Sequence, residues 1–132
     1  MPVRPFHAGV WKCTGRIKKV KGWKGMGRVL EEDFQVIDHC LMIRLPAEVD
    51  HQQAACICEY ADRLLYREDV CNVVFDFENT TFMDSSGIGI IMGRYRKISC
   101  FGGRIYAIHV NRQIRRILGV SGLEKIVEVL EA

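Results

Sequence analysis

One stretch near the middle of the chain passes directly from a strand pattern into a helix pattern, and this order constrains the fold more than any other feature. The strand pattern is a run of β-forming residues, VVFDF, at positions 73–77. The helix pattern follows the spacing of one apolar helix face, at Ile88, Ile91, Met92, Tyr95 and Ile98. A strand followed closely by an amphipathic helix is the basic unit of an α/β domain.

The first turn of the predicted helix carries two hydroxyl groups. Asp84 stands where the N-cap residue is expected, and its carboxylate can accept hydrogen bonds from free backbone N–H groups. Ser85 and Ser86 then lie at the positive end of the helix dipole, which suits a bound phosphate or a phosphoserine. Serines at a helix start are more often simple capping residues, so the residues alone favour that interpretation.

Strand and helix patterns alternate along the rest of the chain. We predict strands over Phe34–Ile37, Cys40–Leu45, Asp69–Phe77, Arg104–His109 and Lys125–Leu130. We predict three helices. The first is capped by Asp50 and ends near Arg67, and the second runs from Ser86 to about Ser99 and is stopped by Gly102-Gly103. The third is capped by Asn111 and ends at Gly119. The first two strands form a hairpin. The pattern predicts a single α/β domain with a mostly parallel mixed sheet of about five strands and helices packed on it.

Length and composition exclude several classes of protein. A chain of 132 residues has room for one globular domain with a real core. No apolar run approaches the ~18–20 residues of a membrane span, and no secretory signal is present, so we expect a soluble, cytoplasmic protein. The six cysteines form no Cys-x-x-Cys pair, so we predict reduced, mostly buried thiols and no metal site.

The basic charge is concentrated at the N-terminus. Residues 1–30 contain eight basic residues and no acidic one, whereas the net charge of the whole chain is +3. The predicted organisation is therefore a basic extension at 1–30 and a mildly acidic domain at 31–132, with no nucleic-acid site on the domain. The extension fits a basic arm for nucleic acid or acidic lipid, a disordered tail, or a non-native sequence ahead of a true start at Met26.

Two catalytic or cofactor-binding alternatives find little support. The Gly87-x-Gly89-x-x-x-Gly93 spacing differs from the dinucleotide-binding fingerprint and lies inside the helix pattern. We expect these glycines to allow close packing of the helix on the sheet. A serine hydrolase would need a base, and only His51 and His109 lie near the relevant strand ends, where both are better explained as polar edge residues.

The segment FMDSSG at 82–87, with Gly89 and GRY at 93–95, closely resembles the phosphorylation-site segment of STAS domains in bacterial anti-sigma factor antagonists. The resemblance runs from about Asp33 to Val129. It implies a binding switch that is not an enzyme and has no catalytic residues, metal or cofactor. Its unphosphorylated form would bind an anti-sigma factor that is also an ATP-dependent serine kinase, and so release the sigma factor. A serine phosphatase would act on the phosphorylated form. No membrane or direct nucleic-acid partner is implied.

The same resemblance assigns individual residues. It implies phosphorylation of Ser85 and a partner surface made of Glu48, Asp50, His51, Asp84, Ser85, Ser86, Gly87, Ile88 and Gly89. Two departures are visible: Ala47 replaces a glycine of the family's loop, and the family's further C-terminal helix has no counterpart before Ala132. We expect the sheet face that this helix would cover to be exposed or used for dimerisation. The alternative function is a ligand-binding or scaffold STAS module of a transporter or stress-signalling assembly.

Overall fold

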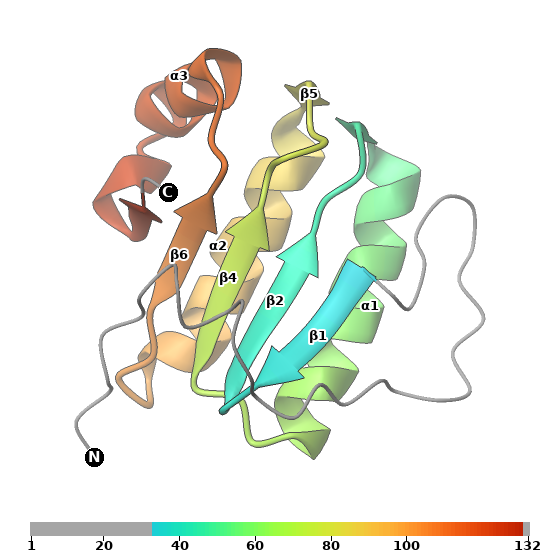
Figure 1. Ribbon diagram of the computed structural model, residues 1–132, viewed down its shortest axis with the longest axis vertical. Coiled ribbons are helices and arrows are strands. Elements are labelled where there is room, and N and C mark those ends of the chain that lie inside the picture. The colour runs from blue at the N-terminus through green and yellow to red at the C-terminus, as the bar shows by residue number, and fades with distance from the viewer. Residues whose placement is uncertain (1–32, 131–132) are drawn as a thin grey trace.

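The computed structural model describes residues 33–130, and these residues form an α/β domain (Figure 1). The main sheet has the strand order β1-β2-β4-β6-β7. Its strands are β1 (Phe34–Ile37), β2 (Cys40–Arg44), β4 (Asn72–Asp76), β6 (Ile105–Ile108) and β7 (Val127–Leu130). The helices are α1 (His51–Arg67), α2 (Ser85–Ser99) and α3 (Arg112–Ser121). Only β1 runs antiparallel to its neighbour, so the predicted mostly parallel mixed sheet is confirmed.

The predicted hairpin of β1 and β2 closes through a two-residue turn. Asp38 and His39 both have positive φ angles, 48° and 65°. Two residues of this kind give a turn whose twist matches that of the strands it joins. The ladder starts directly at the turn, with Ile37 opposite Cys40.

The helices cover one face of the sheet and leave the other face to a smaller apolar cluster. In Figure 1, α1 and α2 lie behind the sheet. Alternation along β2 sends Leu41 and Ile43 into the core beneath the helices and Met42 to the opposite face. There Met42 packs with Val74, Tyr106 and Ile108, all of which are buried. Each fully buried side chain of this size contributes about 1.5–3 kcal/mol to folding.

A second, two-stranded sheet lies at the carboxyl end of the main strands and was not predicted. It pairs β3 (Glu48–Val49) with β5 (Phe82–Met83) in parallel. Each strand has only two residues, too few to produce a hydrophobic period in the sequence. This small sheet joins the segments that precede α1 and α2.

The prediction that Gly119 ends the third helix is wrong. The helix continues to Ser121 and is terminated by Gly122, whose φ of 81° is the left-handed conformation usual at a helix C-terminus. Gly119 lies inside the helix, where a side chain would find ordinary contact with Glu124 only. A short 3-10 helix (Leu123–Lys125) follows, so the last strand starts at Val127 and not at Lys125.

The prediction of mostly buried thiols is also wrong. Among the described cysteines only Cys56 is buried, on the inner face of α1. Cys40 and Cys58 are partly exposed, and Cys71 and Cys100 are exposed because they lie in the turns before β4 and after α2. All five have free thiols.

The predictions for residues 1–30, including the start at Met26, lie outside the described residues. Between residues 33 and 130, none of the helices combines the length and the apolar character that crossing a bilayer requires.

Candidate functional site

The start of α2 presents Ser85 on the surface. Asp84 is the N-cap, and its side-chain Oδ1 accepts a hydrogen bond of 2.7 Å from the backbone N–H of Ser86. Its backbone carbonyl accepts from the N–H of Gly87 at 3.0 Å. Ser85 is the first residue of the helix and is exposed, whereas Ser86 is partly buried. The predicted cap is confirmed, and it leaves the Ser85 hydroxyl at the positive end of α2.

The small β3–β5 sheet brings the predicted Glu48 loop to the start of α2. Glu48 pairs with Phe82 and Val49 with Met83. The backbone N–H of Asp84 donates to the carbonyl of Val49 at 3.4 Å, which continues the contact to the α2 cap. The two segments predicted to form the partner surface are therefore neighbours.

The first helix starts at the same end of the sheet with the same kind of cap. Asp50 caps α1 by accepting a hydrogen bond of 2.9 Å from the backbone N–H of Gln53. Glu48, Asp50 and His51 are all exposed. The N-termini of α1 and α2 therefore follow two paired strands, and the acidic side chains near them are the exposed Glu48 and Asp50 and the partly exposed Asp84.

The glycines of α2 differ in their surroundings, and only one of them supports the predicted close packing. A Cβ atom at Gly87 would overlap the buried side chain of Met83, so this glycine lets α2 approach β5. A Cβ at Gly89 or Gly93 would meet nothing within 4 Å, so packing on the sheet does not explain either of them. Gly89 is exposed and lies one helical turn from Ser85, while Ile88 is partly buried against the core.

Ala47, which stands where the family has glycine, keeps the loop in place through its backbone. Its carbonyl accepts hydrogen bonds from the N–H groups of Thr81 at 2.8 Å and Phe82 at 3.2 Å. Ala47 does not adopt the positive φ that would require glycine, so an L-amino acid fits there without strain. The replacement leaves the contact between the two segments intact.

A buried threonine joins this site to the third helix. Thr80 is 1% exposed and donates through Oγ1 to the carbonyl of Leu45 at 3.3 Å. Its own carbonyl accepts a hydrogen bond of 2.7 Å from the side-chain Nδ2 of Asn111, the N-cap of α3. The connection between β4 and β5 is therefore fixed to both β2 and α3.

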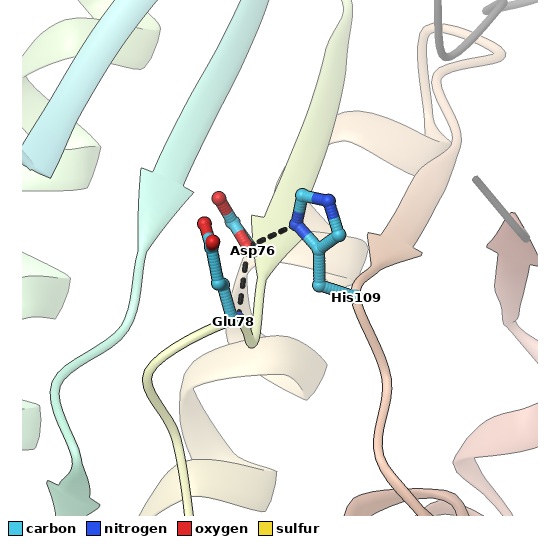
Figure 2. A group of neighbouring side chains, drawn as sticks. All are labelled: Asp76, Glu78 and His109. Atoms are coloured by element: carbon cyan, nitrogen blue, oxygen red, sulfur yellow. Dashed lines mark hydrogen bonds and ion pairs between the residues drawn. The ribbon is translucent and has the colours of Figure 1, made fainter.

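Sequence reasoning missed a polar cluster at the ends of the central strands (Figure 2). Asp76 is 1% exposed, and its Oδ1 lies 2.9 Å from Nδ1 of His109 and 2.9 Å from the backbone N of Glu78. The one signal in the sequence was a carboxylate inside the apolar run VVFDF. His109 adopts a positive φ of 55°, so this side-chain contact accompanies an uncommon backbone conformation.

The ligand atoms of Asp76, Glu78 and His109 lie within 4.8 Å of one another, a spacing that a metal ion could use. Nε of Arg44 also lies 3.4 Å from Asp76 Oδ2, and its Nη2 lies 3.9 Å from Glu78. This guanidinium already offsets part of the carboxylate charge. We therefore assign the cluster a structural role, which is to hold the ends of β2, β4 and β6 together.

The GRY part of the motif holds the two large helices together. Arg94 is 5% exposed, and its Nε lies 3.0 Å from Oδ1 of Asp62 on α1. Nη2 of Arg94 also donates a hydrogen bond of 3.4 Å to Oδ2 of the same carboxylate. Nζ of Lys97 lies 2.6 Å from the same Oδ2 atom. Arg94 thus supports the position of α2 and lies away from its exposed first turn.

Comparisons with known proteins agree on one family. The STAS domain family matches residues 32–132. An anti-sigma F factor antagonist of Paenibacillus polymyxa is 36% identical over 91 residues, which is 69% of this chain and 78% of the relative. The solved structure of the anti-sigma factor antagonist SpoIIAA in its unphosphorylated form superposes with a TM-score of 0.63 at 26% identity, covering 75% of this chain and 88% of that chain. The phosphorylated form of SpoIIAA, a Bacillus cell fate determinant, gives a TM-score of 0.61 at 29% identity, covering 75% and 90%.

Proposed function

Because the chain belongs to the STAS-domain family, we propose that it works as an anti-sigma factor antagonist controlled by phosphorylation of Ser85. The unphosphorylated protein binds an anti-sigma factor that is also a serine kinase, with ATP or ADP bound, and thereby releases the sigma factor. The observation that carries this proposal is the exposed Ser85 at a capped helix start, directly beside the Glu48 loop. Two similar solved structures are the unphosphorylated and phosphorylated forms of one protein, SpoIIAA.

The partner surface in this proposal consists of the α2 start and the adjoining loop. Glu48, Asp50 and His51 supply exposed polar groups, and Gly89 leaves open space beside Ser85. The lack of a side chain at Gly89 lets a partner's backbone approach the helix start closely. The kinase must reach the Ser85 hydroxyl with its nucleotide, so the same surface serves for binding and for phosphoryl transfer.

Phosphorylation acts on this surface through charge. A phosphoserine carries about −1.5 to −2 charges at neutral pH. Where the kinase presents an acidic group or a phosphate of its nucleotide within ~5 Å of Ser85, each like-charge pair costs about 3 kcal/mol at an effective dielectric constant of about 20, which is on the order of a hundredfold in affinity. Asp84 adds negative charge at the same point. The modified protein therefore loses the kinase, and a serine phosphatase restores the active form.

In this role the protein is a substrate of the kinase and a binding switch, and it catalyses no reaction itself. Sigma factors act on RNA polymerase, so we also propose a cytoplasmic location. A scaffold or transporter-attached module has weaker support, because relatives that are 36% and 30% identical to this chain are anti-sigma F factor antagonists.

The test is to incubate the protein with a purified anti-sigma factor kinase and ATP, and to locate the phosphate by mass spectrometry. We expect one phosphate, on Ser85. Ser85→Ala should abolish its incorporation while kinase binding persists, because only an exposed hydroxyl is removed. Ser86→Ala is the matched control and should still be phosphorylated. Phosphate on the Ser85→Ala protein would move the acceptor to Ser86, and failure to retain any anti-sigma kinase would contradict the proposed function.

A further inference from the structure

The outer face of α3 carries a row of arginines. Ile114 and Leu118 face the core and are buried. The exposed face carries Arg112, Arg115 and Arg116. Among the described residues, neither Arg112 nor Arg116 has a carboxylate within ion-pair distance. Arg112 and Arg116 therefore present guanidinium groups that no carboxylate of the described residues neutralises.

The described arginines outside α3 each have an evident structural role, either in an ion pair or at a helix C-terminus. Arg44, Arg63, Arg94 and Arg104 each form an ion pair with an aspartate or glutamate. Arg67 and Arg96 lie in the last turns of α1 and α2, where the helix dipole favours a positive charge. Arg112 is instead the first residue of α3, where the dipole opposes a positive charge, and no acidic residue in that turn compensates. Folding stability does not explain this placement.

The start of α3, which carries Arg112, lies near the segment that leads to Ser85. The cap of α3, Asn111, is hydrogen-bonded to Thr80, which lies in the connection that leads into β5 and the start of α2. The helix packs beside β5, and both lie at the same end of the molecule in Figure 1. A partner that covers Ser85 can therefore extend onto α3.

We propose that Arg112 and Arg116 form a second docking surface, which binds an acidic patch on the anti-sigma kinase that covers Ser85. This inference rests on the proposed function and adds the chemistry of the partner. The Ser85 surface itself is acidic, through Glu48 and Asp50. The combined surface thus has a negative half and a positive half, and a partner fits it in one orientation only. Complementary charges of this kind mainly accelerate association and fix the orientation of the complex.

The experiment compares two double charge reversals in the full chain, measured against the ADP-bound kinase by surface plasmon resonance at about 0.1 M and about 0.5 M salt. For Arg112→Glu/Arg116→Glu we expect affinity to fall about tenfold at the lower salt, mostly through slower association, and the difference to shrink at the higher salt. The control, Arg67→Glu/Arg96→Glu, makes the same change in net charge in the last turns of α1 and α2, away from the helix starts that form the partner surface. It should stay within about twofold of the parent.

Thermal unfolding of each variant checks the fold. Glutamate suits the first turn of a helix, so the α3 variant should melt no lower than the parent. If it does melt lower, Arg112→Gln/Arg116→Gln supplies the same comparison, with a fall of about threefold expected. Equal losses in the α3 variant and the control, or unchanged binding in both, would overturn the inference and leave the proposed function standing. A parent protein that binds no anti-sigma kinase would overturn both.

Discussion

Gly87 and Gly89 lie two residues apart in α2, yet a methyl group would meet very different surroundings at each. We predict that Gly87→Ala destabilises the protein by about 1–3 kcal/mol, because its Cβ would collide with the buried Met83 side chain. For a domain of this size, each kcal/mol lowers the melting temperature by roughly 4–8 °C. Thermal unfolding followed by circular dichroism measures the change.

Gly89→Ala is the matched control. The added methyl group has open space and improves helix propensity, so stability should rise by up to about 1 kcal/mol. A more stable variant that binds the kinase less tightly would show that Gly89 is present for the partner. Equal loss of stability in both variants would contradict the packing that we describe for α2.

Cys40 should be the least reactive of the partly or fully exposed cysteines. Burial, and secondarily the neighbouring Cys71, raises the pKa of its thiol from 9.0 to about 12. A raised pKa keeps the thiol neutral, and only the thiolate is a nucleophile. At pH 8 we therefore expect iodoacetamide to label the exposed Cys71 and Cys100 and to spare Cys40 until the protein is denatured. Peptide mass spectrometry checks this, and rapid native labelling of Cys40 would contradict it.

At the scale of whole elements, the ion pair between Asp62 and Arg94 tests what holds α1 and α2 together. Asp62→Ala should destabilise the protein by roughly 3 kcal/mol, because it leaves the buried guanidinium of Arg94 without its partner. Asp62 is itself partly exposed, which sets this value at the lower end of the range for breaking a buried pair. Chemical denaturation of each variant supplies the free energies of unfolding.

Lys97→Ala removes the other partner of the same carboxylate from a side chain that is 42% exposed, and should cost at most about 1 kcal/mol. Replacing both members of the buried pair, in Asp62→Ala/Arg94→Met, should recover part of the loss, because no buried charge remains. A double variant less stable than Asp62→Ala alone would show that packing of the Arg94 side chain matters more than its charge.

The elements with a full hydrophobic period could be predicted from sequence, and the shorter ones could not. The helices that start at Asp50 and Asp84 have both a capping residue and an apolar face, and both caps form as expected. The β3–β5 pair has two residues per strand, and its contacts are between backbone atoms, which leave no pattern of side-chain types. Gly119 was misleading because glycine is tolerated inside a helix whose end is fixed by Gly122.

The candidate site, too, could be predicted only in part from the sequence. Asp84 and Ser85 could be identified from a strand, a cap and a motif that are contiguous in the sequence. The contacts that connect them to the rest of the fold join residues about thirty positions apart, such as Asn111 with Thr80. No local spacing reports such a contact, and the same is true of Asp76 with His109. Side-chain exposure at turns, as at Cys71, likewise depends on the assembled sheet.

For the molecule as a whole, we predict that phosphorylation of Ser85 removes binding without disturbing the fold. A negative charge at the start of α2 stabilises the helix by roughly 0.3–1 kcal/mol, so the melting temperature should stay within a few degrees of that of the unmodified protein. Affinity for the kinase should fall by about a hundredfold or more. Calorimetry and a binding assay on the phosphorylated protein measure the two quantities separately.

Ser85→Asp should also lose affinity for the kinase while keeping its melting temperature. The loss of affinity should be smaller, because aspartate has less charge and bulk than phosphoserine. A large fall in melting temperature, or a loss of helical signal on phosphorylation, would mean that the switch operates through unfolding. The electrostatic account would then be wrong.

The β3–β5 pair holds the Glu48 loop against α2 through main-chain atoms, while the side chains of Glu48 and Phe82 point to exposed positions. Substitutions at these surface positions leave the pairing in place. In the proposed function, several copies of such a protein in one cell can therefore each bind a different partner through a few changes of surface side chains. Parallel signalling routes in one cell then remain insulated from one another while sharing one architecture.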